Sequence, residues 1–226
     1  MRLIILMLCI SILLAFSDGS RAQPQPCNQV DQAEQTRCQI EKAIASQNNA
    51  LMQKIFETSI YAAVNDKEAC AGAGYVACAM NSGNLEAAKY LFSKGFDANW
   101  TNPKGYQLVG TVIDLGPIGQ QQRDDFVVAL FGLFLDNGAS LDVLTQHYTI
   151  WNPNHTILNF LMEKCIQGAQ ANHARYNRMI QTSIEKNPEN IPLAKSAFAF
   201  IKQYLVAHPY GDVANCTNMY NWVYSH

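Results

Sequence analysis

Residues 83–105 decide the fold, and they read Gly-Asn-Leu-Glu-Ala-Ala-Lys-Tyr-Leu-Phe-Ser-Lys-Gly-Phe-Asp-Ala-Asn-Trp-Thr-Asn-Pro-Lys-Gly. The apolar residues recur at helical spacing, and Gly95 follows them as the left-handed residue that ends a helix. A second apolar stretch, residues 76–80, lies upstream and is separated from the first by Asn81-Ser82-Gly83. The sequence therefore predicts two antiparallel helices joined by a tight turn.

Such a helix pair cannot bury both of its apolar faces alone, so it needs stacked copies of itself. Residues 83–99 resemble the ankyrin repeat, because they match the family's G-H-x-E-I-V-x-L-L-L-x-x-G-A-D-V-N in spacing and in residue type. The resemblance implies an all-α solenoid of stacked helix-turn-helix units. In that family, β-turn fingers join the units and project at right angles to the helices.

Further units are placed by counting from Gly95. Ser59, Gly95 and Gly138 take equivalent positions, so the steps are 36 and 43 residues. Units in the family have about 33 residues, and the longer second step therefore predicts an insertion at residues 116–123. Residues 39–67 lack the signature glycine and read as a capping repeat, because terminal units face water on one side.

The last unit is the least regular. Thr156 opens its first helix, and residues 192–207 keep the helical period of a closing helix. Residues 167–190 between them are polar and read as irregular, or they prolong the preceding helix well past Met162 and then turn at Asn187-Pro188. The sequence predicts one domain over residues 23–226, with units at 39–67, 69–101, 102–144 and 151–212 and a C-terminal cap at 213–226.

Residues 1–22 have the pattern of a secretory signal peptide. Arg2 precedes an apolar run over residues 3–16, and Ser20-Arg21-Ala22 provides the cleavage region. About 14 apolar residues are fewer than the roughly 20 that a membrane-spanning helix needs, although a membrane anchor is the alternative. We expect cleavage, a secreted or periplasmic protein, and no stable membrane insertion of the mature chain.

An even number of cysteines in an exported chain favours disulfides over free thiols. A metal site is not expected, since no Cys-x-x-Cys or His-x-x-x-His pair occurs. Six cysteines allow 15 connectivities, among which we favour the pairing of neighbours, with the last pair fixing the C-terminal segment. The disulfide candidates are Cys27, Cys38, Cys70, Cys78, Cys165 and Cys216.

Charge and motifs exclude several function classes. Without residues 1–22 the chain has 14 basic and 17 acidic side chains and no basic cluster, so nucleic acid is not an expected partner. No G-x-S-x-G, P-loop, H-E-x-x-H or glycine-rich dinucleotide motif occurs. The sequence predicts a protein that is not an enzyme and that uses no cofactor and no metal.

The resemblance to ankyrin repeats implies that a partner protein docks on the finger tips and on the inner, first-helix face. Trp, Tyr and His are typical interface anchors. The alternative for Trp100 and Trp151 is that they fold back between neighbouring fingers. The candidate protein-binding residues are Asn81, Ser82, Trp100, Thr101, Lys104, Tyr106, His147, Tyr148, Trp151 and His155.

Two functions stay open at this point. The first is a non-enzymatic, exported protein-binding module, either an inhibitor or immunity-type protein or an accessory of an exported enzyme. The second is a hydrolytic enzyme whose site lies in residues 167–190. The fold itself names no partner.

Overall fold

The computed structural model describes residues 27–28, 31–115, 121–143, 156–167, 170–207 and 224–225. The chain is predominantly helical in these ranges, and its named elements there are all helices. Thr101 and Gln107 form an isolated antiparallel β-bridge. The all-α class predicted from the sequence is therefore confirmed.

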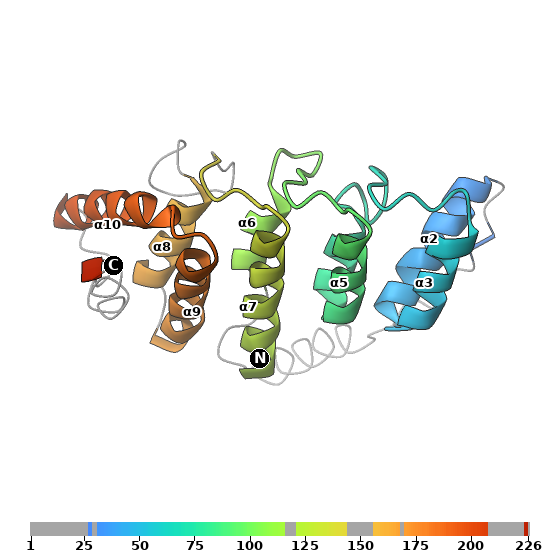
Figure 1. The fold of residues 1–226 in the computed structure, drawn as a ribbon, viewed down its shortest axis with the longest axis horizontal. Helices are drawn as coiled ribbons and strands as arrows, with labels where there is room; N and C mark the ends of the chain where they lie inside the picture. The colour runs from blue at the N-terminus through green and yellow to red at the C-terminus, as the bar shows by residue number, and fades with distance from the viewer. Residues whose placement is uncertain are drawn as a thin grey trace, which may run out of the picture.

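In the described part of the chain the helices form four pairs followed by a further helix, α10. Figure 1 shows the pairs side by side in a row, with connecting segments along one edge and α10 lying across the end. The pairs are α2 (Gln32–Ala45) with α3 (Asn49–Thr58), α4 (Tyr75–Ser82) with α5 (Leu85–Ser93), α6 (Leu108–Ile113) with α7 (Gln121–Asp136), and α8 (Ile157–Gln167) with α9 (Gln170–Lys186), before α10 (Asn190–Ala207).

Neighbouring pairs pack on one another in two layers. In the first layer α2 packs on α4 and α6 packs on α8; in the second, α3, α5, α7 and α9 each pack on the next. Phe92 of α5 meets Phe134 of α7 edge-on, with ring centroids 4.9 Å apart. Burying one such side chain contributes roughly 1.5–3 kcal/mol. The buried apolar residues form one cluster from α2 to α10.

Local sequence signals set the ends of these helices. The side-chain oxygens of Asn48 and Asn84 each accept a hydrogen bond from the backbone N–H of the residue three positions later. They therefore cap the N-termini of α3 and α5. Gly95 and Gly138 follow α5 and α7 with φ of 87° and 85°. The two glycines thus have the left-handed conformation that the sequence predicts for them.

The last helix pair differs from the prediction. Residues 170–186, which read as irregular, form α9, and α9 packs on both α7 and α8. Tyr176, Met179, Ile180 and Ile184 are buried, because they recur at helical spacing along an otherwise polar helix. The partner of α8 is therefore α9, and the predicted closing helix at residues 192–207 belongs to α10 instead.

The predicted insertion is also shorter than expected. Residues 121–123 of the expected insertion at 116–123 already belong to α7, and residues 116–120 lie outside the described chain. The predicted signal peptide at residues 1–22 and most of the predicted cap at 213–226 lie outside it as well. None of the helices described is long and apolar enough to cross a bilayer.

Two disulfides join cysteines that are neighbours in sequence, as predicted. Cys27 bonds to Cys38 of α2, and Cys70 bonds to Cys78 of α4. Cys165 is fully buried, and its predicted partner lies outside the described residues. Disulfides of this kind are compatible with an oxidising, extracellular compartment.

Candidate binding groove beside the 102–105 turn

Residues 102–105 form a hydrogen-bonded turn between α5 and α6. The Gly105 N–H donates to the Asn102 carbonyl, and the Asn102 N–H donates to the Tyr106 carbonyl, both at 2.9 Å. The Asn102 side-chain oxygen accepts the N–H groups of Lys104 at 2.9 Å and Tyr106 at 3.0 Å. Gly105 has φ of 82°, a conformation that glycine adopts without strain. Asparagine, proline and glycine at these positions are typical turn residues.

Trp100 packs into the core immediately before this turn. Its side chain is 8% exposed, and its ring centroid lies 5.6 Å from that of Phe96. The indole Nε1–H donates to the Gly72 carbonyl at 3.4 Å. Trp100 therefore folds back between connecting segments, which was the alternative expectation for it. It does not project freely from the surface as an anchor.

Two glycines allow this close approach. A Cβ atom at Gly72 would lie 2.6 Å from Pro103 Cγ, and one at Gly74 would lie 3.0 Å from the Phe96 ring and 3.3 Å from Trp100. Both glycines also have positive φ, 86° and 81°. Any larger residue at position 72 would displace the turn from the segment that precedes α4.

A shallow groove of about 450 Å³ opens between this segment and the residues that follow α5. Lys67 and Asp97 bring opposite charges to it, Thr101 a hydroxyl group, and Trp100 an apolar wall. Polar groups beside an aromatic wall are typical of protein interfaces. We call it the Trp100 groove, and its lining residues are Lys67, Gly72, Asp97, Asn99, Trp100, Thr101 and Pro103.

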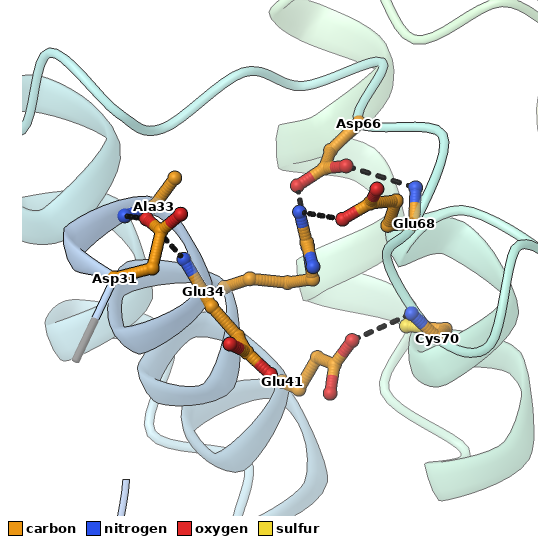
Figure 2. Close-up of polar contacts among 8 residues, drawn as sticks. Asp31, Ala33, Glu34, Glu41, Asp66, Glu68 and Cys70 are labelled. Carbon is orange, nitrogen blue, oxygen red and sulfur yellow. Dashed lines mark hydrogen bonds and ion pairs between the residues drawn. The ribbon is translucent and has the colours of Figure 1, made fainter. Parts of the chain in front are cut away.

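A network of charged groups holds the segment that carries Lys67. Arg37 of α2 donates from Nε to Asp66 at 2.8 Å and from Nη2 to Glu68 at 2.6 Å. Glu41 of α2 accepts the Cys70 N–H at 2.6 Å, and Figure 2 shows these contacts converging on residues 66–70. Most of these groups are half-buried or buried, so the network is screened less than a surface ion pair. It fixes one wall of the groove to the first helix pair.

Tyr75, the first residue of α4, lies fully buried beside this network. Burial raises the pKa of its phenol, and the negative charges of Asp66 and Glu41 raise it further. The Phe56 ring packs edge-on against it, with centroids 5.6 Å apart. Tyr75 therefore remains protonated well beyond the ordinary range of tyrosine.

The structure brings together only some of the predicted binding residues. Trp100 and Thr101 line the groove, and Lys104 is exposed at the tip of the neighbouring turn. Tyr106 is half-buried where the turn ends. The predicted residues His147, Tyr148, Trp151 and His155 lie outside the described chain.

Asn81 and Ser82, which were also predicted to bind a partner, do not line the Trp100 groove. They end α4, whose first turn lies beside Trp100, so an eight-residue helix separates them from the groove. Ser82 donates its hydroxyl to the Cys78 carbonyl, and its own carbonyl accepts from Gln47 Nε2 at 3.3 Å. These two residues belong to the opposite end of the helix pair.

Sequence reasoning missed Lys67, Gly72, Asp97 and Asn99 as groove residues. Asp97 and Asn99 were read only as parts of the repeat pattern, and Lys67 lies in a connecting segment without a pattern of its own. A signal did exist at Gly72-Ala73-Gly74, because two glycines so close together mark a close backbone approach. What approaches them is a residue about 30 positions later, which no local pattern names.

Two other groups in the described chain contain side chains of reactive types. Glu41, Cys70 and Cys78 place potential metal-ligating atoms within 4.8 Å of one another, but both sulfur atoms belong to a disulfide. Ser183 of α9 lies in the region proposed for a hydrolytic site. Its buried hydroxyl donates to the Ile180 carbonyl at 2.7 Å, within its own helix.

The groove is thus a preformed concave surface on the edge of the row where the connecting segments lie. Comparison of the chain with protein-family models, with curated proteins and with solved structures gives no match.

Proposed function

We propose that this chain is an exported, non-enzymatic protein-binding module of the ankyrin type, and that its partner docks on the 102–105 turn and the Trp100 groove. The observation that carries the proposal is the groove itself. It joins charged, amide and hydroxyl groups to an aromatic wall beside a turn that is held by hydrogen bonds. A preformed surface loses little conformational entropy when a partner binds.

The arrangement of the helices supports the ankyrin-type assignment. Helix pairs stand in a row, two of them end at left-handed glycines, and a hydrogen-bonded turn follows the α4–α5 pair. Each feature agrees with the repeat pattern around Gly95. The leader pattern at residues 1–22 and the two disulfides support export to the periplasm or the exterior.

The groove suits a segment of protein better than a small molecule. It is shallow, and its charges lie at opposite walls, Lys67 on one and Asp97 on the other. A partner segment with both polar backbone groups and charged side chains could satisfy both walls. Within this class, the module acts as an inhibitor or immunity-type protein or as an accessory of an exported enzyme.

The first experiment identifies the partner. The tagged full-length protein is purified under native conditions from the exported fraction, and stoichiometric companions are identified by mass spectrometry. A purified chain that hydrolyses substrates without any companion would instead support the alternative of an enzymatic site in residues 167–190.

The second experiment locates the surface. Thr101→Arg places a long side chain in the groove, and Lys67→Glu reverses the charge of one wall. We expect each change to lower the affinity for the partner at least tenfold, which corresponds to about 1.4 kcal/mol of binding free energy. Lys89→Glu is the matched control, because Lys89 is exposed on α5 and is absent from the groove. Equal affinity of all three variants and the unchanged protein would refute the proposed surface.

A further inference from the structure

Arg175 of α9 is a buried arginine with an unused hydrogen-bonding edge. It is 1% exposed, and it donates from Nη1 to the Leu115 carbonyl at 3.1 Å and to Asp124 at 3.2 Å. Its Nε and Nη2 atoms are buried, and no acceptor in the described part of the chain lies within hydrogen-bond distance of them. Buried donors of this kind are rare and call for a missing ligand or water.

The two unused atoms form one side of the guanidinium plane. Nε–H and Nη2–H point in the same direction, and together they match the two oxygen atoms of a carboxylate or phosphate. Nη1 meanwhile donates to the Leu115 carbonyl, just after α6, and to Asp124 of α7. One side of the guanidinium is therefore bonded within the chain, and the other side is available to a ligand.

The positive charge around Arg175 is also not fully balanced. Arg123, in the first turn of α7, is half-buried, and its guanidinium lies over the Phe126 ring at 5.2 Å. Burial lowers the pKa of Arg123, and the positive charge of Arg175 lowers it further. Asp124 is the carboxylate that faces Arg175. Among the described residues Asp124 pairs with Arg175 and no carboxylate pairs with Arg123, which favours a further negative charge nearby.

Arg123 connects this region to the surface, because it is half-buried whereas Arg175 is buried. Arg123 and Asp124 are consecutive in α7, and α7 packs directly on α9 (Figure 1). The positive charges of the two arginines favour an anion at the start of α7.

We propose that Arg123 and Arg175 form a binding site for a small oxyanion, a free phosphate or a carboxylate, at the start of α7. The site is separate from the Trp100 groove, and it does not depend on the proposed binding function. The ligand receives two parallel hydrogen bonds from Arg175, and its charge balances Arg123. Occupation joins α7 to α9 and stabilises the folded chain.

The test uses the full-length mature protein at constant ionic strength, with sodium phosphate or sodium acetate replacing sodium chloride. The midpoint of thermal unfolding and the ¹H–¹⁵N resonances of the arginine Nε–H groups are followed together. We expect a saturable rise of the midpoint and a saturable shift of the Arg175 Nε–H. A response to phosphate alone identifies a tetrahedral anion as the ligand, and a response to both identifies any oxyanion with two free oxygens.

Arg175→Lys keeps the positive charge but removes the two-nitrogen edge, so the apparent affinity for the anion should fall about tenfold or more. Arg178→Lys is the control, because Arg178 also lies on α9 but is exposed and paired with Asp125. Arg123→Gln should weaken the binding of the anion without disturbing the hydrogen bonds of Arg175 Nη1 to Leu115 and Asp124. If Arg175→Lys does not fold, the titration of the unchanged protein decides. Absence of a shift at Arg175, or equal affinity in Arg175→Lys and the unchanged protein, overturns the proposal.

Discussion

The side-chain amide of Asn99 bridges to the backbone of Gly138, 39 residues later in the chain. Its Nδ2 donates to the Gly138 carbonyl at 3.1 Å, and its Oδ1 accepts the Ser140 N–H at 2.9 Å. One unit earlier, Asn65 makes the same two bonds, at 2.9 Å each, to the Gly95 carbonyl and to the N–H two residues beyond it. These asparagines thus join successive connecting segments and keep the helix pairs in register.

The Asn99 bridge predicts a destabilising substitution on the surface. Asn99→Asp keeps the acceptor oxygen but places a negative oxygen against the Gly138 carbonyl, where Nδ2 now donates. We expect a loss of about 1 kcal/mol or more in the free energy of unfolding, measured by chemical denaturation. Asn137→Asp is the control, because it makes the same change at an amide that donates locally, to the Leu133 carbonyl. A loss at Asn99 no larger than the loss at Asn137 would show that the bridge contributes no more than a local hydrogen bond does.

The disulfides predict two linked peptides. Digestion of the non-reduced, exported protein should release Cys27 linked to Cys38 and Cys70 linked to Cys78, identified by mass spectrometry. Replacing Cys70 and Cys78 together by Ser should cost about 2–3 kcal/mol, as chain-entropy arguments give for so short a loop. Peptides that link Cys38 to Cys70, or alkylation of all four cysteines before reduction, would contradict these pairings.

Local sequence signals predict much of the fold. The features that they do not predict depend on packing between residues far apart in the chain. Gly95 and Gly138 end helices wherever they stand, and the helical period of their neighbours is visible in sequence. The helix α9 was not predicted as a separate helix paired with α8, because its polar residues outnumber a narrow apolar stripe, which includes Tyr176 and Ile180. The helical period of this stripe is visible in the sequence, but the prediction gave more weight to the polar composition than to that period.

The binding residues were harder to predict than the helices. The position of Trp100 depends on the absence of a side chain at Gly72, which comes 28 residues earlier. No pattern within a single repeat contains both residues. The unused edge of Arg175 likewise depends on groups from α6 and α7, so sequence alone treats it as one more charge on a polar helix.

Buried Tyr75 predicts a loss of stability in alkaline solution. Tyrosine in the unfolded chain has a pKa near 10, and burial raises the pKa of Tyr75 in the folded protein. Below pH 10 the phenol is protonated in both states, so its contribution to stability is fully present there. As the pH rises above 10, only the unfolded chain releases the proton, and the free energy of unfolding should fall by about 1 kcal/mol per pH unit.

The variant Tyr75→Phe isolates this effect, because the other tyrosines titrate in both proteins. We expect a shallower decline between pH 10 and about 11.5 in Tyr75→Phe than in the unchanged protein, measured by chemical denaturation at each pH. Tyr61→Phe serves as the control, since Tyr61 is 44% exposed. Parallel declines in all three proteins would mean that Tyr75 ionises as readily when folded as when unfolded.

The contact between Gly72 and Pro103 predicts how the groove responds to one added methyl group. Gly72 and Gly95 have nearly the same positive φ, 86° and 87°, so alanine suffers the same backbone strain at both positions, about 1–2 kcal/mol. At Gly95 the added Cβ meets no atom within 4 Å, whereas at Gly72 it lies 2.6 Å from the Pro103 ring. Only Gly72→Ala therefore forces the 102–105 turn to move.

We expect Gly72→Ala to lower the free energy of unfolding by about 1–3 kcal/mol more than Gly95→Ala does, the usual cost of overpacking. The displaced turn should also weaken the hydrogen bond from Trp100 Nε1 to the Gly72 carbonyl, which tryptophan fluorescence and the indole N–H resonance can follow. Since the groove lies between the two segments that separate, the partner should bind Gly72→Ala more weakly than Gly95→Ala. Equal stability and equal affinity in the two variants would mean that the turn does not depend on this contact for its position.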